Sequence, residues 1–219
     1  LLMDASTGTI LYEKDIDVKL APASTTKIMT AVLAVEKLSL EQEITVPAEA
    51  QSTGTLMGLK PGNVVTVETL IYGMMLCSGN DAAVTLAIQM AGSQEGFAAM
   101  MNEKAQEIGM EDSHFVTASG LDAEGHTVTV RDMARLARVY LSNEFLRKVA
   151  ETKKYQGTTV DKTVSFPMEN TNRLLHTPTK ATGEDVIDMP DFTYAFTTGL
   201  KTGTTSSAKG CLVACAPND

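Results

Sequence analysis

The chain has 219 residues, of which 43% are hydrophobic and 21% charged, so it can bury a full core and has an ordinary globular composition. Its formal net charge of -9 argues against a nucleic-acid partner, because phosphates would repel it. The three cysteines form no CxxC pair and no Cys/His cluster with metal spacing, so the sequence predicts free thiols and no metal site. No apolar run is long enough to span a membrane.

The first part of the chain is predicted to form a hairpin and then a buried helix. Short apolar runs at 1–3 and 9–12 flank a segment of turn-forming residues, which is typical of a β-hairpin. A helix is predicted from about 25 to 38, and it must be buried because it is apolar on most sides. Residues 41–65 are predicted to be irregular, and Thr66 is the predicted N-cap of the next helix.

The middle of the chain keeps a helical pattern. Asp81 is the predicted cap of a helix from 82 to about 91, and a further helix is predicted to continue to about Ile108. Thr129 and Asp132 have the spacing of a capping box at the start of a helix through Leu141.

From about residue 150 the content of Thr and Val rises and the helical period fades. Strands are predicted at 192–200 and 210–216, around a turn at 202–209. The predicted fold class is therefore α/β (α+β), an antiparallel β-sheet flanked by helices with an all-helical insertion. We expect one domain over residues 1–219, in which 1–44 and about 146–219 contain the sheet and about 45–145 is helical. Both ends look trimmed, so we expect this domain to be truncated.

The first candidate motif is the run from Ser24 to Lys27, at the start of the predicted buried helix. A spacing of three places both side chains on one helical face, about 5–6 Å apart at Cβ. A buried lysine can be neutral and accept the proton of a serine nucleophile, and the helix start offers N–H groups to an oxyanion. The pattern alone is not specific. Ser206 and Lys209 match it inside a predicted turn, and a helix cap explains Ser24 equally well.

The second candidate motif is Ser78-Gly79-Asn80, in a tight junction between two predicted helices. A hydroxyl here can relay a proton, and an amide can bind a substrate carbonyl. The alternative interpretation is that these three residues only end one helix and begin the next.

The third candidate motif is Lys201-Thr202-Gly203, followed by Thr204, on a predicted late strand. Lysine and threonine supply a charge and a hydroxyl for an anionic substrate group. Glycine allows a ligand backbone to lie against the strand edge. Taken alone, this motif is also explained as a turn.

The three motifs occur in the order SxxK, SxN and KTG, the set found in serine β-lactamases and penicillin-binding proteins. Here the sequence resembles the D-Ala-D-Ala carboxypeptidase family of low-molecular-mass penicillin-binding proteins, and nearly the whole chain takes part. The resemblance implies a β-lactamase/transpeptidase-like fold. The segments that carry it are 3–8, 21–30, 76–83, 114–115, 119–122, 131–134, 172–175 and 199–204.

The resemblance implies a role for each residue of the first two motifs. Ser24 attacks the carbonyl between two D-alanines and becomes acylated, with Lys27 as the general base. Ser78 passes the proton to the departing D-Ala, and Asn80 orients the substrate amide. Water then frees the acyl group, no cofactor or metal is required, and penicillins acylate Ser24 as substrate mimics.

The third motif is implied to bind the substrate. Lys201 and Thr202 face its terminal carboxylate, Gly203 belongs to the same binding strand, and the N–H groups of Ser24 and Thr204 form the oxyanion hole. Some relatives have His in place of Thr204, which matters little if only its backbone serves.

The implied partners are a peptidoglycan stem peptide ending in D-Ala-D-Ala and β-lactam antibiotics. The location follows from the substrate and is extracytoplasmic, in the periplasm or at the outer face of the cytoplasmic membrane. Family members continue past the last strand here, and an arginine that assists carboxylate binding in some of them would lie beyond Asp219. Membrane anchoring is therefore expected only through a C-terminal segment absent from this sequence.

Three alternative functions stay open. A class A β-lactamase usually has Asp at the position of Gly79 and a Glu-x-x-x-Asn loop, whereas Glu169 is followed by Arg173 four residues later. An endopeptidase on D-Ala crosslinks is poorly separated by sequence. A non-catalytic peptidoglycan-binding protein predicts loss of a motif residue. The histidines at 114, 126 and 176 favour structural roles, because no serine lies in a GxSxG elbow.

Overall fold

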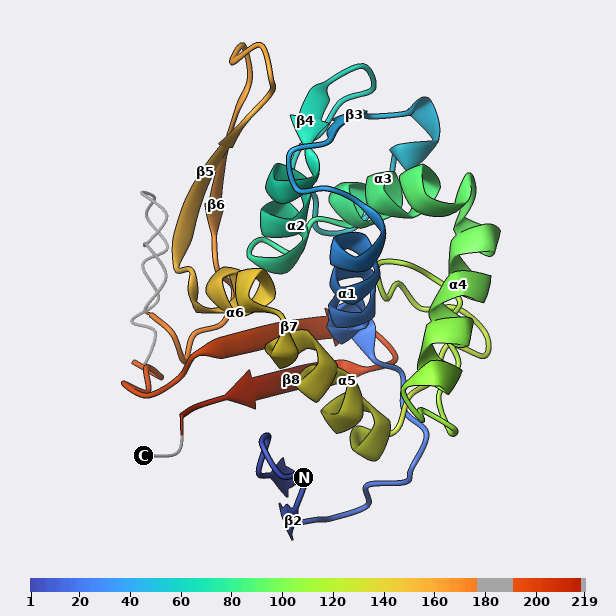
Figure 1. Cartoon of the computed structure of the whole chain (residues 1–219), viewed down its shortest axis with the longest axis vertical. Helices are drawn as coiled ribbons and strands as arrows, with labels where there is room; N and C mark the ends of the chain where they lie inside the picture. The colour runs from blue at the N-terminus through green and yellow to red at the C-terminus, as the bar shows by residue number, and fades with distance from the viewer. Residues whose placement is uncertain (177–190, 218–219) are drawn as a thin grey trace.

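The computed structural model describes residues 1–176 and 191–217, and Figure 1 shows their mixed α/β arrangement. The elements in chain order are β1 (Leu2–Met3), β2 (Ile10–Tyr12), η1 (Ala23–Thr26), α1 (Lys27–Lys37), β3 (Glu43–Thr45), η2 (Ala48–Ala50), β4 (Val64–Thr66), α2 (Val67–Met75), α3 (Asn80–Ala91), α4 (Gln94–Glu107), α5 (Val130–Ser142), α6 (Glu144–Glu151), β5 (Lys154–Thr158), β6 (Ser165–Glu169), β7 (Gly199–Thr205) and β8 (Lys209–Cys215). Among the described residues, no helix is both long and apolar enough to cross a bilayer.

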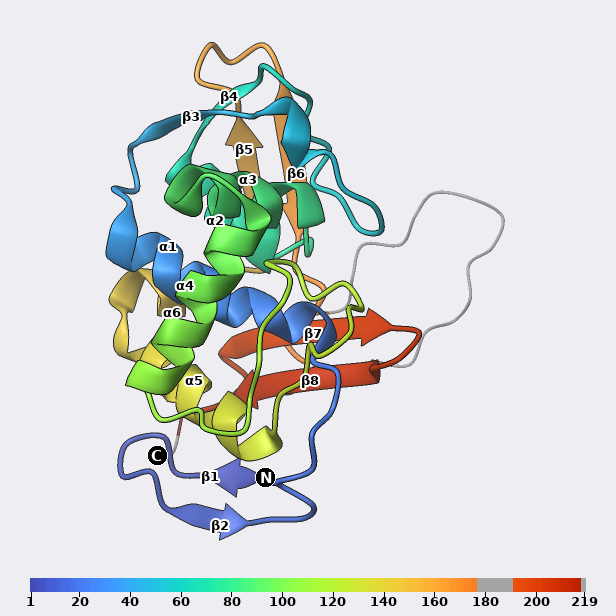
Figure 2. The same cartoon turned by 90° about the vertical axis from the view of Figure 1, so that its right-hand side faces the viewer.

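The strands pair in antiparallel fashion, which confirms the predicted fold class. In the described part of the chain they form four two-stranded sheets, β1-β2, β3-β4, β5-β6 and β7-β8, where one continuous sheet was expected. The longest pairing is β7 with β8, whose register runs from Gly199 opposite Cys215 to Thr205 opposite Lys209. Both views place β1-β2 beyond β8 and α1 on the other side, beside β7 (Figures 1 and 2).

The third strand pair changes one expectation. The strand β3 pairs with β4, with Glu43 opposite Thr66 and Thr45 opposite Val64. The segment 45–145 therefore contains the strand β4 and is not purely helical. The apolar residues Ile44 and Val65 lie opposite each other in this pair and are 2% and 0% exposed. These strands are only three residues long, too short for alternation to be read from the sequence.

The predicted strand at 192–200 is wrong over most of its length. The strand β7 begins only at Gly199 and continues to Thr205, so the predicted turn at 202–209 shrinks to the residues between β7 and β8. Alternating aromatic residues before β7 imitate a strand pattern, but their side chains are about half exposed. Tyr194 donates its backbone N–H to the carbonyl oxygen of Leu174 instead of pairing in a ladder.

The helix α1 is the centre of the hydrophobic core, as its all-round apolar sequence predicted. Every residue from Lys27 to Ala34 is buried, and α2, α3, α4 and α5 all contact it (Figure 2). The first turn before it is a 3-10 helix, η1, which carries Ser24. A side chain at the start of α1 is therefore held rigidly and kept from water, the setting in which a lysine loses its proton most readily.

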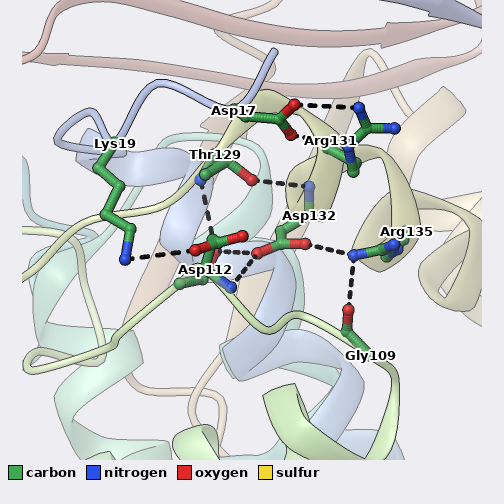
Figure 3. Close-up of polar contacts among 9 residues, drawn as sticks. Asp17, Lys19, Gly109, Asp112, Thr129, Arg131, Asp132 and Arg135 are labelled. Carbon is green, nitrogen blue, oxygen red and sulfur yellow. Dashed lines mark hydrogen bonds and ion pairs between the residues drawn. The ribbon is translucent and has the colours of Figure 1, made fainter.

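The start of α5 is joined to the loop before it by a buried carboxylate. Asp132 is 1% exposed. It accepts hydrogen bonds from the Ser113 hydroxyl at 2.8 Å, the Asp112 backbone at 3.1 Å and Arg135 at 2.7 Å (Figure 3). Its own N–H donates to Thr129 Oγ1, which confirms the predicted cap of this helix. This network fixes the segment that leads to residues 117–126, which pack against η1.

Candidate active site

The nucleophile candidate Ser24 lies in η1, a tight turn packed under a neighbouring loop. Ala23 has φ 48°, in the left-handed region, and orients this turn. Residues 117–126, named here the 117–126 loop, lie against it. A Cβ added at Gly120 would stand 1.8 Å from the carbonyl oxygen of Ala23. Only glycine allows this approach, because any side chain would push the loop off η1.

Lys27 has three hydrogen-bond partners, which together define the direction of its lone pair. Its Nζ donates to Ser24 Oγ at 2.9 Å, to Asn80 Oδ1 at 2.8 Å and to the carbonyl oxygen of Ser119 at 2.6 Å. The last two oxygens can only accept, whereas a serine hydroxyl can also donate. When Lys27 is neutral, its two N–H bonds go to the acceptors and its lone pair faces the Ser24 O–H. This is the geometry of a general base beside its nucleophile.

Burial sets the protonation of the two lysines. Lys27 and Lys201 are 0% and 1% exposed. Burial first, and then the positive charge of Lys201, lowers the pKa of Lys27 well below its ordinary value. Burial lowers the pKa of Lys201 to about 8. The burial of Lys27 and the nearby charge of Lys201 therefore both favour the loss of a proton from Lys27, which the predicted role requires.

The second motif occupies the junction of α2 and α3. Ser78 is 8% exposed and has φ 63°, in a backbone region that non-glycine residues seldom adopt. Asn80 contacts Lys27 through Oδ1, and its Nδ2 donates to the Thr53 carbonyl at 2.6 Å, which fixes the orientation of the amide. Among the hydrogen bonds of Lys27 to described residues, none goes to Ser78.

Asp81 does not cap α3 as predicted, because Gly79 holds that position. Its carboxylate instead accepts the backbone N–H groups of Met57 at 2.8 Å and of Gly58 and Leu59 at 2.9 Å each. The side chain is 4% exposed. Asp81 thus holds the irregular loop at 57–59 against the start of α3, next to Asn80. No sequence pattern signals this contact, because the partners of Asp81 are backbone atoms.

The third motif lies on β7, which runs directly past η1. A Cβ added at Gly203 would stand 2.8 Å from Ser24 N and 3.0 Å from Ala23 Cβ. Glycine therefore permits close packing of the strand on the nucleophile segment, in addition to the predicted approach of a ligand. Lys201 donates to the carbonyl oxygen of Thr202 at 2.9 Å, and Thr204 is exposed on the same strand.

Comparison with known proteins identifies the family of the chain. A family model described as D-alanyl-D-alanine carboxypeptidase, peptidase S11, matches residues 1–219. The chain belongs to the D-alanyl-D-alanine carboxypeptidase family. It is 36% identical to DacF of Bacillus subtilis over 99% of its own length and 34% identical to the carboxypeptidase of Streptomyces sp. (strain K15) over 96%. The crystal structure of DacD from Francisella tularensis matches 99% of the chain with a TM-score of 0.85 at 31% identity.

The chain matches only part of the length of those relatives. It spans 53% of the Bacillus protein, 73% of the Streptomyces protein and 62% of the Francisella chain.

Two supports of the family's first motif come from the 117–126 loop. One is the Ser119 carbonyl that binds Lys27, a backbone group without a side-chain signal. The other is His126, which is 4% exposed. Its Nδ1 accepts from the Thr117 backbone at 3.2 Å, so in the neutral ring Nε2–H donates to Thr26 Oγ1 at 3.1 Å. Burial, and secondarily the charge of His114, lowers the pKa of His126 to about 4.

The remaining sequence features lie away from catalytic geometry. The second SxxK match places Ser206 in the exposed turn before β8, and Lys209 begins that strand. His176 hydrogen-bonds the Asn170 carbonyl through Nε2, and His114 the Gly125 carbonyl through Nδ1, which fits structural roles. The cysteines at 77, 211 and 215 are free thiols, as predicted.

Proposed function

We propose that this chain is a serine-type D-Ala-D-Ala carboxypeptidase, which removes the terminal D-alanine of peptidoglycan stem peptides through a Ser24 acyl-enzyme. The observation that carries the proposal is the 2.9 Å contact between Lys27 Nζ and Ser24 Oγ, with the two other directions of Nζ taken by carbonyl oxygens. In this proposal residues 1–219 form one catalytic domain.

In the acylation step, Ser24 Oγ bonds to the carbonyl carbon between the two D-alanines while its proton passes to Lys27. The carbonyl oxygen takes up negative charge, which the backbone N–H groups of Ser24 and Thr204 stabilise. The packing of Gly203 on Ser24 N supports this pairing, because it brings β7 against the nucleophile. Collapse of the intermediate breaks the C–N bond, and the proton taken from Ser24 goes to the amine of the leaving D-alanine.

Ser78 delivers that proton to the leaving amine. Its position two residues before Asn80, which contacts Lys27, supports a short path. Asn80 both holds Lys27 and orients the substrate amide with its remaining amide hydrogen. In deacylation, water bonds to the acyl carbon while its proton passes to Lys27; the bond between that carbon and Ser24 Oγ then breaks, and Lys27 returns the proton to Ser24 Oγ.

Lys201 and Thr202 bind the terminal carboxylate of the stem peptide. A buried ammonium loses part of its hydration, so its attraction to a carboxylate is stronger than at the surface. The same groups and Ser24 accept β-lactams, whose carboxylate and reactive amide imitate the peptide. Because the substrate is cell-wall material, the enzyme acts outside the cytoplasm.

The test is release of D-alanine from diacetyl-L-lysyl-D-alanyl-D-alanine. We expect release from this peptide and little from the same peptide ending in L-alanine. Lys27→Arg places a permanently protonated group where a neutral base is needed, so release falls by at least about 10²-fold. Equal release from both peptides, or an active Lys27→Arg variant, would contradict the proposal.

A further inference from the structure

The segment 170–172 lies outside the three motifs in sequence but contacts the third motif in the folded chain. Asn170 and Asn172 are 2% and 1% exposed, and Asn170 Nδ2 donates to the Thr152 carbonyl at 3.0 Å. Thr171 stands between these buried residues and is exposed. Its N–H donates to the carbonyl oxygen of Leu76 at 3.0 Å, two residues before Ser78. The backbone of Thr171 is thus fixed from both sides, while its side chain is left for the site.

The Thr171 side chain contacts the third motif directly. Its Oγ1 lies 2.7 Å from Oγ1 of Thr202, and either hydroxyl can be the donor. A hydroxyl has one proton, so such a pair uses one O–H internally and leaves one O–H for a ligand. If Thr171 donates, Thr202 is free to donate outward. If Thr202 donates, its O–H is occupied by the hydrogen bond to Thr171 and cannot donate to a ligand.

An anion at the third motif selects the first of these two arrangements. Lys201 belongs to the same motif, and its buried ammonium donates to the carbonyl oxygen of Thr202 at 2.9 Å, so a positive charge lies beside the Thr202 residue. A carboxylate there accepts from Thr202, and the hydrogen bond from Thr171 polarises that hydroxyl further, since chained hydrogen bonds strengthen one another. A neutral ester in the same place gains much less from this chain.

We propose that Thr171 is a positioning residue for the substrate carboxylate, which donates to Thr202 and thereby directs the Thr202 hydroxyl to the anion. This inference rests on the proposed function and adds a determinant of selectivity for a free carboxyl terminus. The residue lies outside SxxK, SxN and KTG, and only its contact in the folded chain reveals it.

The experiment compares acylation of Ser24 by benzylpenicillin and by its methyl ester, using the second-order rate constant from intact-protein mass. The readout is the ratio of the acid rate to the ester rate, which partial misfolding leaves unchanged. Thr171→Val removes the hydroxyl at nearly constant volume and lowers the ratio by about tenfold, whereas Thr171→Ser restores it to within about twofold. In a Thr202→Val background, Thr171→Val changes the ratio no further.

Three other results would overturn either the inference about Thr171 or the proposed function. If Thr171→Val slows acid and ester equally, the residue has only a structural role and the inference fails. If it lowers the ratio in the Thr202→Val background as well, the effect does not pass through Thr202 and the inference also fails. Absence of any adduct on Ser24 of the parent chain overturns the proposed function, and the inference with it.

Discussion

Replacing Asp81 with Asn tests whether the second motif is held by a buried carboxylate. Oδ1 accepts the N–H groups of Met57 and Ala82, and Oδ2 accepts those of Gly58 and Leu59. An asparagine has the same shape, but its NH₂ group cannot accept. Whichever way the amide turns, two backbone N–H groups lose their acceptor and face another donor.

The expected cost follows from those two groups. Each unsatisfied N–H costs about 1–3 kcal/mol, with the lower end appropriate here because the loop is partly exposed. Loss of a negative charge in the first turn of α3 adds about 0.5 kcal/mol. We therefore expect Asp81→Asn to lower the free energy of unfolding by about 2.5 kcal/mol. Asn80 lies beside Asp81, so the acylation rate of the folded variant should also fall by at least about tenfold.

The assay is urea unfolding followed by circular dichroism, with acylation by benzylpenicillin measured below the unfolding transition. Asp161→Asn is the matched control, because Asp161 also accepts a backbone N–H and hydroxyls but lies exposed at a hairpin tip. The control should unfold at the urea concentration of the parent. If Asp81→Asn also unfolds there, or acylates at the parent rate, the Asp81 carboxylate does not hold the second motif.

Three further predictions concern the same site. Gly203→Ala should slow acylation by about 10²-fold, because its Cβ would stand 2.8 Å from Ser24 N. Gly210→Ala is the control, because its Cβ meets nothing within 4 Å, and it should match the parent in the same mass assay. Because Lys27 acts deprotonated and burial lowers its pKa, kcat/KM for D-alanine release should rise with pH and level off well below the ordinary lysine pKa; a rise that tracks free lysine would contradict this. The pKa of His126 is lowered to about 4 in the folded chain, so between about pH 6.5 and 4 the unfolded chain binds more protons than the folded chain. We therefore expect the free energy of unfolding to fall by roughly 3 kcal/mol as the pH is lowered from about 6.5 to about 4. Urea unfolding at several pH values checks this, and a His126→Gln variant with the same pH dependence would show that another group is responsible.

The parts of the fold that the sequence predicted are those with a local physical signature. The buried helix is predictable because α1 is apolar on nearly every side, and Thr66 and Thr129 both cap helices as their side chains suggest. The strand before Gly199 failed because alternating aromatics also suit an exposed irregular segment. The pair β3-β4 was missed because three residues are too few to show a period of two.

The candidate site divides along a similar line. Ser24, Lys27 and Asn80 are found through motifs, and the folded chain brings their side chains into contact. The Ser119 carbonyl and the partners of Asp81 are backbone groups, which no residue pattern reveals. Thr171 is an ordinary threonine whose meaning depends on a contact with residue 202, 31 positions away.

We infer that Ser24, and not the serine of the second SxxK match, is the nucleophile. The most direct test is intact-protein mass after incubation with benzylpenicillin, on the parent chain, Ser24→Ala and Ser206→Ala. We expect one stable adduct on the parent and on Ser206→Ala, and none on Ser24→Ala. An adduct that persists on Ser24→Ala would contradict it, and penicillin consumed without an adduct would show a β-lactamase instead.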